Sequence, residues 1–514
     1  MTRERLSAAV RVLLTGTVAA GLVYAGSATS ATLRVGTPPA AGAGSSAAVS
    51  AYGVLCPGTE LDGDTGAAPI RTSATVSAAS APTAALGDLR LPAGAGLLAI
   101  SPGSDGRAAS ASGSSAPAAG AKSTKERGEL ATARVTGPDP VLVSATGPLA
   151  PGVVAAQETR AAGKLAWGLL GRTCLPAAAE TWLTAGAGTA GRQERLILVN
   201  PGDNPVDVQV DVLGAHGPVE TGAAGRLSVP ARGRSAILLD ALAPAEPAPA
   251  VHVQASGGFV AATLADQWVD GITPHGLETT GPLAAPAPIQ VLPGIRGGLA
   301  TTVRVVNPGD AQAVVSVRTL TGDGPRALPG GRGVLRVAAG STGELRLDRG
   351  LAEGTWALEV TSDIPVTAAA FTVPRKDPTD FAWSAAGEAI TGLAGTAYPK
   401  APADLTRTLS LAATGGAVQV QVVTLPASGQ SQQAEPQSRT VDLAADSSTT
   451  IDLSATRAVW VRPLSEAGQR DSGQLRGAVL TSGAEGAQFV LSTLGLAPAR
   501  LTTTSVAVHP ADNG

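Results

Sequence analysis

Short runs in which apolar and polar residues alternate are the clearest pattern along the chain. Val206, Val208, Val210 and Val212 alternate with polar residues, and residues 313–317 and 418–422 repeat the arrangement. A period of two with one polar face is typical of a half-buried β-strand. Long amphipathic helical patterns are absent from the sequence, which therefore predicts an all-β chain.

These strands belong to an internal repeat of about 106–107 residues. Residues 196–203 (LILVNPGD) recur as residues 303–310 (VRVVNPGD), and in weaker form as residues 409–416 (LSLAATGG). About 100 residues per copy, with several short strands and frequent Gly and Pro turns, predict tandem Ig-like β-sandwich modules.

The predicted domain organisation has an N-terminal segment, four β modules and a tail. The expected boundaries are 1–31 for a signal peptide or membrane anchor, 32–50 for a flexible linker, 51–180 for an N-terminal β module with a disordered insert at 103–128, 181–285, 288–392 and 393–498 for three β-sandwich repeats, and 499–514 for the tail.

The Asn-Pro-Gly-Asp motif is the most conspicuous local signal. It comprises Asn200, Pro201, Gly202 and Asp203, and again Asn307, Pro308, Gly309 and Asp310. Pro at the second position and Gly at the third predict a type II turn between two strands, in which Gly takes a positive φ. A ligand or calcium role for Asp203 and Asp310 is the alternative, although the third copy has Gly416 in place of the Asp.

No motif predicts catalysis or a bound metal or cofactor. The Asp62-Gly-Asp64 segment resembles the start of a calcium loop, but Ser73 stands where a closing Glu would be needed, so a plain turn is favoured. The four histidines lack metal-ligand spacing, and no nucleophile elbow or phosphate loop occurs. We expect no enzyme, while an acidic site that sequence cannot reveal stays an alternative.

The N-terminus predicts export. Three arginines among the first 11 residues precede an apolar run at 12–25, and small residues follow at 26–31. A run of this length suits a cleaved signal peptide, and an uncleaved anchor is the alternative. Either places the rest of the chain outside the cytoplasmic membrane, with membrane contact only through this segment if it is retained.

Charge and cysteine content refine this picture. The formal net charge is −3, charged residues make up 15% of the chain, and no basic block is present, so nucleic-acid binding is not expected. The two cysteines, Cys56 and Cys174, predict a disulfide in an exported protein, and two unrelated buried thiols are the alternative.

The six tryptophans are the largest aromatic side chains in a chain with only 3% aromatic residues. Trp268 and Trp383 are predicted to occupy the same place in successive repeats and to pack at module boundaries. Trp167 and Trp182 flank Cys174, where packing around the disulfide is favoured and stacking on a glycan is the alternative.

Three segments together resemble a known group of proteins: residues 145–155 (ATGPLAPGVVA), Cys174 followed by Glu180-Thr-Trp182, and residues 198–203 (LVNPGD). The chain is similar in these motifs to an uncharacterised family of secreted actinobacterial proteins, a domain of unknown function. The resemblance covers about residues 51–498 and implies export and an envelope location, without a mechanism.

Two functions from different classes follow as hypotheses. The first is an extracytoplasmic scaffold or accessory protein that holds an unidentified envelope protein or glycan, with surface-glycan assembly as one setting. The second is a carbohydrate-binding or adhesive module, which predicts coplanar, exposed tryptophans. An enzyme with an unrecognised acidic site ranks below both.

Overall fold

The computed structural model describes residues 46–58, 71–102, 122–135, 137–163, 166–186, 191–328, 332–347, 351–353, 356–375, 380–427, 435–464, 473–486 and 488–504. Residues 48–502 form one compact unit, and residues 1–47 with 503–514 form another. The predicted signal or anchor, the Asp62–Asp64 loop and most of the linker and tail lie outside the described residues.

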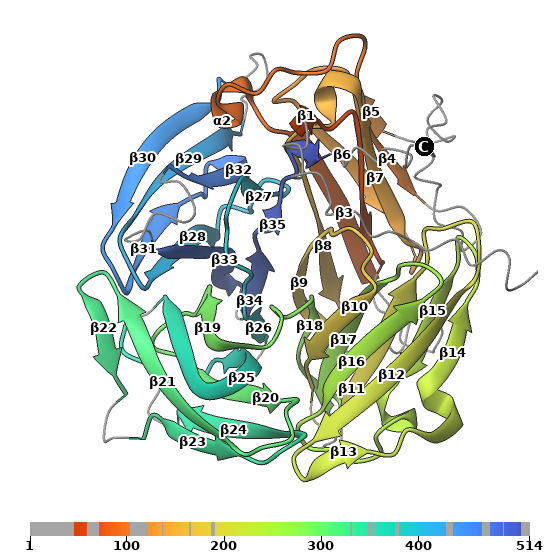
Figure 1. The fold of residues 1–514 in the computed structure, drawn as a ribbon, viewed down its shortest axis with the longest axis vertical. Coiled ribbons are helices and arrows are strands. Elements are labelled where there is room, and N and C mark those ends of the chain that lie inside the picture. The colour runs from red at the N-terminus through yellow and green to blue at the C-terminus, as the bar shows by residue number, and fades with distance from the viewer. Residues whose placement is uncertain are drawn as a thin grey trace, which may run out of the picture. The chain divides into compact units, whose positions relative to one another are not determined.

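Within residues 48–502 almost every regular element is a strand, so the predicted all-β class is confirmed. Figure 1 shows four groups of strands that follow one another along the chain. Each group contains strands on two sheets or, in the third, one sheet that bends into two halves. The Ig-like assignment of the modules stays a prediction.

The first group forms two four-stranded antiparallel sheets. One has the order β2 (Ala51–Cys56), β7 (Val141–Thr146), β4 (Leu97–Pro102), β5 (Lys122–Thr124), and the other β6 (Leu130–Val135), β3 (Arg71–Ser80), β8 (Val153–Ala162), β9 (Trp167–Thr173). The short helices α2 (Thr83–Leu86) and η1 (Gly147–Leu149) lie between strands. The disorder predicted for 103–128 is wrong for residues 122–128, because β5 pairs with β4 and Arg127 donates to the carbonyls of Ala81 and Pro151; residues 103–121 lie outside the described part.

The second group covers the first repeat. One sheet contains β10 (Glu180–Thr184), β16 (Ala250–Ser256), β12 (Val206–Gly214), β13 (Gly217–Val219) and β14 (Arg226–Val229), and the other β15 (Arg234–Leu238), β11 (Arg192–Val199), β17 (Ala261–Asp270) and β18 (Thr273–Thr280), with η2 (Gly222–Gly225) and η3 (Leu239–Ala241) between strands. The predicted alternation in β12 is confirmed: its four valines are buried, while Asp207 and Gln209 are exposed. Burying each valine side chain contributes about 1.5–3 kcal/mol.

The third group covers the second repeat, and its long strand β25 (Ala357–Val373) belongs to both halves of the bent sheet. The first half of β25 pairs with β19 (Ala287–Pro293) and β21 (Ala313–Thr321), and β21 also pairs with β22 (Gly324–Ala327) and β23 (Val334–Val337). The second half pairs with β20 (Ala300–Asn307) and β26 (Ala382–Ala385), and β20 also pairs with β24 (Ser341–Leu347).

The fourth group covers the third repeat. One sheet has the order β30 (Gln437–Leu443), β29 (Val418–Pro426), β32 (Thr456–Pro463), β27 (Ala394–Ala397), β35 (Ala497–Pro498), and the other β31 (Ser447–Asp452), β28 (Leu405–Thr414), β33 (Gln474–Glu485), β34 (Gln488–Gly495). A separate two-stranded pair joins β1 (Ser46–Ala48) to β36 (Thr502–Thr504).

The first Asn-Pro-Gly-Asp turn joins strands of two sheets, and the second joins the two halves of the bent sheet, but neither is a type II turn. Neither Gly202 nor Gly309 has a positive φ. The buried Asn200 side chain shapes the first turn instead: its Oδ1 accepts from the Gly202 N–H at 2.8 Å, and its Nδ2 donates to three backbone carbonyls. Asn307 makes the equivalent bonds in the second turn. An Asn side chain that bonds its own backbone two residues on removes the need for a left-handed Gly.

Strand register corrects the predicted equivalence of Trp268 and Trp383. Trp268 lies in β17, whereas Trp383 lies in β26, the counterpart of β18. Each tryptophan follows an Asp by two or three residues, but these similar Asp and Trp spacings fall at places in the two repeats that are not equivalent.

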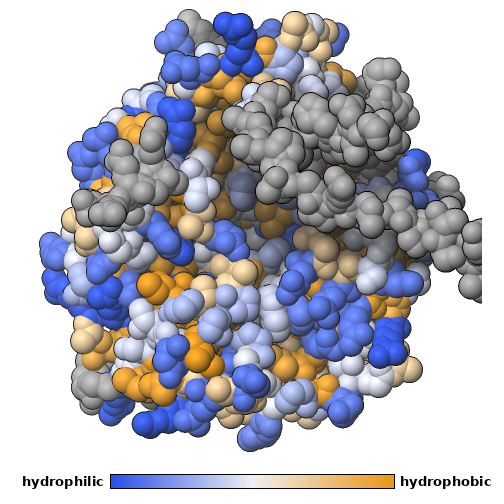
Figure 2. Space-filling model, viewed as in Figure 1, coloured by the Kyte–Doolittle hydropathy of each residue, from blue (hydrophilic) through white to orange (hydrophobic). Residues whose placement is uncertain are grey.

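The strands that follow the long central strand of each group, β9, β18, β26 and β34, pack against one another in the middle of the unit. Figure 1 shows these four labels gathered where the groups meet. Figure 2 shows hydrophilic and hydrophobic residues interspersed over the described part of one face. The contacts between the four modules are therefore concentrated along β9, β18, β26 and β34.

Candidate functional site

A single buried carboxylate, Asp380, connects all four modules. Its Oδ2 accepts from the backbone N–H groups of Leu169 in β9 and Leu491 in β34, both at 3.1 Å. Its Oδ1 accepts from the N–H of Leu277 in β18 at 3.4 Å and from Phe381 at 3.0 Å. We call Asp380 and these four amides the Asp380 hub, because one donor comes from each module.

The donors on the three repeats occupy matching places. Each donor lies three residues before a residue that pairs with the long central strand of its own repeat. The paired residue on the central strand is Leu264 for Leu277, Ala370 for Phe381 and Val479 for Leu491. The internal repeat therefore directs equivalent amides toward one point, and a carboxylate from only one repeat fills it.

Two glycines make room for the Asp380 side chain. A Cβ on Gly168 would lie 2.5 Å from Asp380 Oδ1, and one on Gly276 would lie 2.6 Å from Asp380 Cα. Both residues also have positive φ angles, of 148° and 112°. Any larger residue at either place would collide with the hub and adopt a strained backbone.

Burial is the main influence on the pKa of the Asp380 carboxyl. It raises the pKa of the Asp380 carboxyl well above its usual range, although the four amide bonds act in the opposite direction. The neighbouring Glu278 on β18 is also fully buried, and burial, with a smaller contribution from the charge of Asp380, raises its pKa as well. Its Oε1 accepts from the N–H groups of Gly171 and Thr279 at 3.2 and 2.9 Å.

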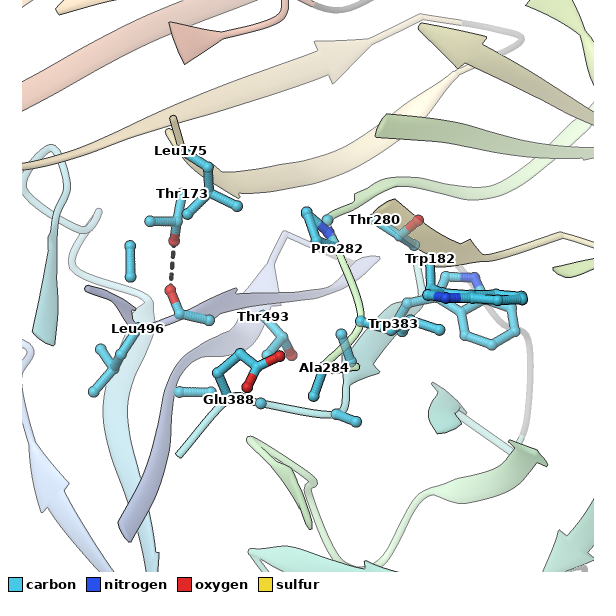
Figure 3. Close-up of a pocket in the computed structure, with 18 of the residues that line it drawn as sticks. Thr173, Leu175, Trp182, Thr280, Pro282, Ala284, Trp383, Glu388, Thr493 and Leu496 are labelled. Atoms are coloured by element: carbon cyan, nitrogen blue, oxygen red, sulfur yellow. Dashed lines mark hydrogen bonds between the residues drawn. The ribbon is translucent and has the colours of Figure 1, made fainter. Parts of the chain in front are cut away.

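A cavity of about 370 Å³ lies two residues further along the same strands, and we call it the central cavity. Its lining comes from all four modules and includes Arg172 and Thr173 of β9, Thr279 and Thr280 of β18, Trp383 and Glu388 at and after β26, and Thr493 and Leu496 at and after β34. Figure 3 shows side chains from these elements around the cavity, with the bond from Thr173 Oγ1 to the Gly495 carbonyl at 2.6 Å.

Arg172 stands out among the lining residues because it is a buried cation without a counter-charge. Its Nη1 and Nη2 donate only to the carbonyls of Thr280 and Ala262, at 3.3 and 3.2 Å. Its Nε has no hydrogen-bond partner, and among the described residues no carboxylate acts on its pKa. Burial alone lowers the pKa of Arg172 to about 9.

Two lining hydroxyls share this lack of partners. Thr279 Oγ1 and Thr280 Oγ1 are buried without a hydrogen bond. Buried polar groups are normally hydrogen-bonded, so these two hydroxyls, like several others in the described part of the chain, are exceptions.

The predicted disulfide between Cys56 and Cys174 is present, and both residues are buried. It ties β2 to the segment that follows β9, so it braces the strand that carries Arg172. A bridge over 118 residues stabilises the fold by roughly 4–5 kcal/mol in the chain-entropy account.

Asp203 of the first predicted turn forms an exposed ion pair with Arg232 at 2.5 Å.

The tryptophans singled out for stacking are not exposed. Trp182 is 9% exposed and lines the central cavity, and the His252 ring covers one of its faces at 4.0 Å. Trp167 begins β9 and is half-buried. Glycan stacking by Trp167 or Trp182 stays a prediction, and of the two only Trp182 borders the cavity.

Sequence reasoning did not identify Asp380, Glu278 or Arg172 as site residues. In the sequence, Asp380 is an acidic residue three positions before Trp383 with no other distinguishing feature. A usable signal was present in the Gly-Leu pairs at 168–169 and 276–277, one in each of two modules. Nothing in the sequence indicated that these pairs face an Asp from a third module.

Within the described residues, no helix has the length and apolar character required to cross a membrane. No group of three or more His, Cys, Asp or Glu residues in that part of the chain is arranged to hold a metal ion.

Comparisons with known proteins identify a family without a function. A family model described as "Family of unknown function (DUF5719)" matches residues 129–454. No curated protein matches the chain. Among solved structures, Thermotoga maritima 1070 is 18% identical over 18% of this chain and 85% of its own, with a TM-score of 0.15. The pilus adhesin SpaC from Lactobacillus rhamnosus GG, in an open conformation, is 8% identical over 85% of this chain and 57% of its own, with a TM-score of 0.10. Likeness at these TM-scores supports no inference about fold or function.

Proposed function

We propose that this chain, which belongs to the DUF5719 family of unknown function, is an exported, non-catalytic scaffold or accessory protein of the cell envelope. The observation that supports the proposal most is the Asp380 hub, which fastens four modules to one acceptor. Domains joined by linkers alone move relative to one another by default. A chain whose modules are held together by buried hydrogen bonds is suited to holding partners at fixed positions.

The contacts between neighbouring modules support the same proposal. Arg407 of the third repeat pairs with Glu158 of the N-terminal module at 2.6 Å, and both side chains are buried. Trp383 of the second repeat donates from Nε1 to Asp266 of the first at 2.8 Å. Breaking a buried pair by removing one partner costs about 3–5 kcal/mol, so such contacts resist separation of the modules.

The burial of the acidic residues at the centre favours a structural role over a catalytic one. Asp380 and Glu278 are 0% and 1% exposed, and backbone amides occupy the oxygens of Asp380. A general acid or base must reach its substrate within hydrogen-bond distance. These carboxyls serve the architecture, and we propose that the protein performs no reaction.

The location outside the cytoplasm is part of the proposal. Disulfides persist mainly in oxidising compartments, and the bridge between Cys56 and Cys174 fits that setting. The apolar N-terminal segment and the resemblance to secreted actinobacterial proteins point in the same direction.

The test is crosslinking of a C-terminally tagged copy in its native cells, followed by identification of what the envelope fraction yields. We expect a reproducible envelope-protein partner that is recovered with the wild-type chain and lost with Asp380→Ala. Asp323→Ala, at an exposed ion pair with Arg326, is the matched control and should retain the partner. Recovery of no partner, together with an unchanged envelope after gene deletion, would overturn the scaffold role.

A further inference from the structure

We propose that the central cavity is a binding site for a small hydroxylated monocarboxylic acid, of which an acidic sugar such as a uronic acid is the chemical type. This inference does not depend on the scaffold role, because a ligand can occupy the cavity whether or not an envelope partner exists. It rests on the size of the cavity, on the unpaired charge of Arg172, and on the polar groups that surround it.

The dimensions suit a small ligand. The cavity of about 370 Å³ lies within the range of roughly 300–1,000 Å³ that is usual for small-molecule sites. Its walls combine Trp182, Trp383, Pro282 and Leu496 with threonine hydroxyls, as Figure 3 shows. A mostly apolar lining with a few polar groups is typical of a site that fixes the orientation of a compact molecule.

Arg172 indicates that the ligand carries a negative charge. Three other arginines at contacts between modules have carboxylate partners: Arg192 with Asp266 at 2.6 Å, Arg304 with Glu344 at 2.8 Å, and Arg407 with Glu158 at 2.6 Å. Arg476, as buried as Arg172, lacks a carboxylate, but all three of its guanidinium nitrogens donate hydrogen bonds, to Gly387, Thr414 and Gln474. Arg172 is 7% exposed and has only two long bonds to carbonyls. Burying a cation without a counter-ion is costly, and an anion in the adjoining cavity would offset that cost.

The threonines point to an oxygen-rich ligand. The hydroxyls of Thr279 and Thr280 have no partner in the described structure, and each can both donate and accept. They stand on β18 next to the carbonyl that Arg172 contacts. Both oxygen atoms lie beneath the surface of the cavity, so a ligand oxygen reaches Thr280 Oγ1 only after the threonine side chain rotates about χ1.

Glu388 limits the charge of the ligand. It is exposed, it lines the same cavity, and its Oε1 accepts from the Ala285 N–H at 2.9 Å. A carboxylate at this place can accept from a ligand hydroxyl but repels a second anionic group. The cavity should therefore prefer a monoanion with hydroxyls to a dianion.

The experiment is calorimetric titration of the full mature chain with glucuronate, and with glucose, inorganic phosphate and glucarate as comparisons. We expect glucuronate to bind with a Kd below about 1 mM, while glucose, which lacks the carboxylate, and glucarate, which carries a second one, bind at least about tenfold more weakly. Tighter binding of a glucuronate-terminated oligosaccharide than of free glucuronate would assign the ligand to the end of an acidic glycan, and equal or weaker binding would assign it to the free acid.

Three variants decide whether this cavity is the site. Arg172→Gln should reduce glucuronate affinity at least about tenfold, because a charge-assisted bond is lost. Thr280→Val removes a hydroxyl that has no partner within the protein, so it should leave folding intact and still weaken binding several-fold, which keeps the test decisive if Arg172→Gln does not fold. Glu388→Gln should reduce the discrimination against glucarate.

Four results would overturn the proposal. These are no heat signal with glucuronate at millimolar concentration, equal binding of glucose, phosphate binding in preference to glucuronate, and unchanged glucuronate affinity in a folded Arg172→Gln or, if that variant does not fold, in a folded Thr280→Val.

Discussion

Two buried aspartates, Asp266 and Asp380, show different ways of placing a negative charge inside the protein. Both are 0% exposed. Asp266 has a cation beside it, since Arg192 donates to both of its oxygens at 2.9 and 2.6 Å. Asp380 has four backbone amides and no cation among the described residues.

The difference reflects where each residue stands. Asp266 lies in β17, where it joins the first repeat to Trp383 of the second, so a long Arg side chain can reach it. Asp380 lies where four strands converge, and the glycines at 168 and 276 leave space for nothing larger than its own carboxylate. Backbone amides need no extra volume, so they are the donors that such a crowded centre can supply.

The largest effect should come from removing each carboxylate. Asp380→Ala leaves four amides without an acceptor, and at about 1–3 kcal/mol for each buried group the loss should be about 4 kcal/mol or more. Asp266→Ala removes both hydrogen bonds that Arg192 makes to Asp266 and leaves it only the longer ion pair with Glu194 at 3.8 Å, so it should cost about 3–5 kcal/mol. Thermal unfolding followed by circular dichroism measures both changes.

Limited proteolysis separates the two cases further. Asp380→Ala should expose the connections between all four modules, whereas Asp266→Ala should loosen mainly the contact of the first and second repeats. Equal stability of Asp380→Ala and the wild-type protein would show that the hub is not a structural centre.

The close approach at the hub can be tested with a single methyl group. Gly168→Ala places a Cβ against Asp380 at an unfavourable φ and should destabilise by about 2–3 kcal/mol. Gly257→Ala is the matched control, because Gly257 also has a positive φ of 79° but nothing lies within 4 Å of the added Cβ. The control should lose only about 1 kcal/mol. A similar loss in both variants would mean that backbone strain alone, and not crowding at the hub, explains the glycine.

The periodic features of this fold could be predicted from the sequence, and the hub could not. Alternating valines predicted β12 because the pattern is local and one face must be buried. The repeat of Asn200 at Asn307 likewise indicated equivalent turns, although the turn type was wrong because the Asn side chain organises the backbone.

The central site depends on contacts between distant residues. Asp380 contacts Leu169, which is 211 residues away along the chain, and Leu277, which is 103 residues away. No spacing rule relates such positions in a single sequence. Arg172 likewise reads as an ordinary polar residue of a strand until neighbouring modules bury it.

The smallest change in stability is expected for Glu278→Gln, and at neutral pH it should be an increase. The pKa of Glu278 is raised in the folded state, so its contribution to stability is fully present below the unfolded pKa of about 4.3 and is lost as the pH rises through the folded value. Glu278→Gln keeps an acceptor for the amides of Gly171 and Thr279 but cannot ionise. The variant should therefore match or fall below the wild-type melting temperature near pH 4 and exceed it at pH 7.

Melting curves of the two proteins across this pH range provide the measurement, with Glu220→Gln, which lies away from the hub on the first repeat, as the control. Asp380 acts in the same direction and remains in the variant, so part of the decline with pH should persist. A parallel pH profile for Glu278→Gln and the wild type would instead mean that Glu278 is ionised in the folded protein, and that the backbone amides around the hub, like Arg192 beside Asp266, suffice to hold a negative charge.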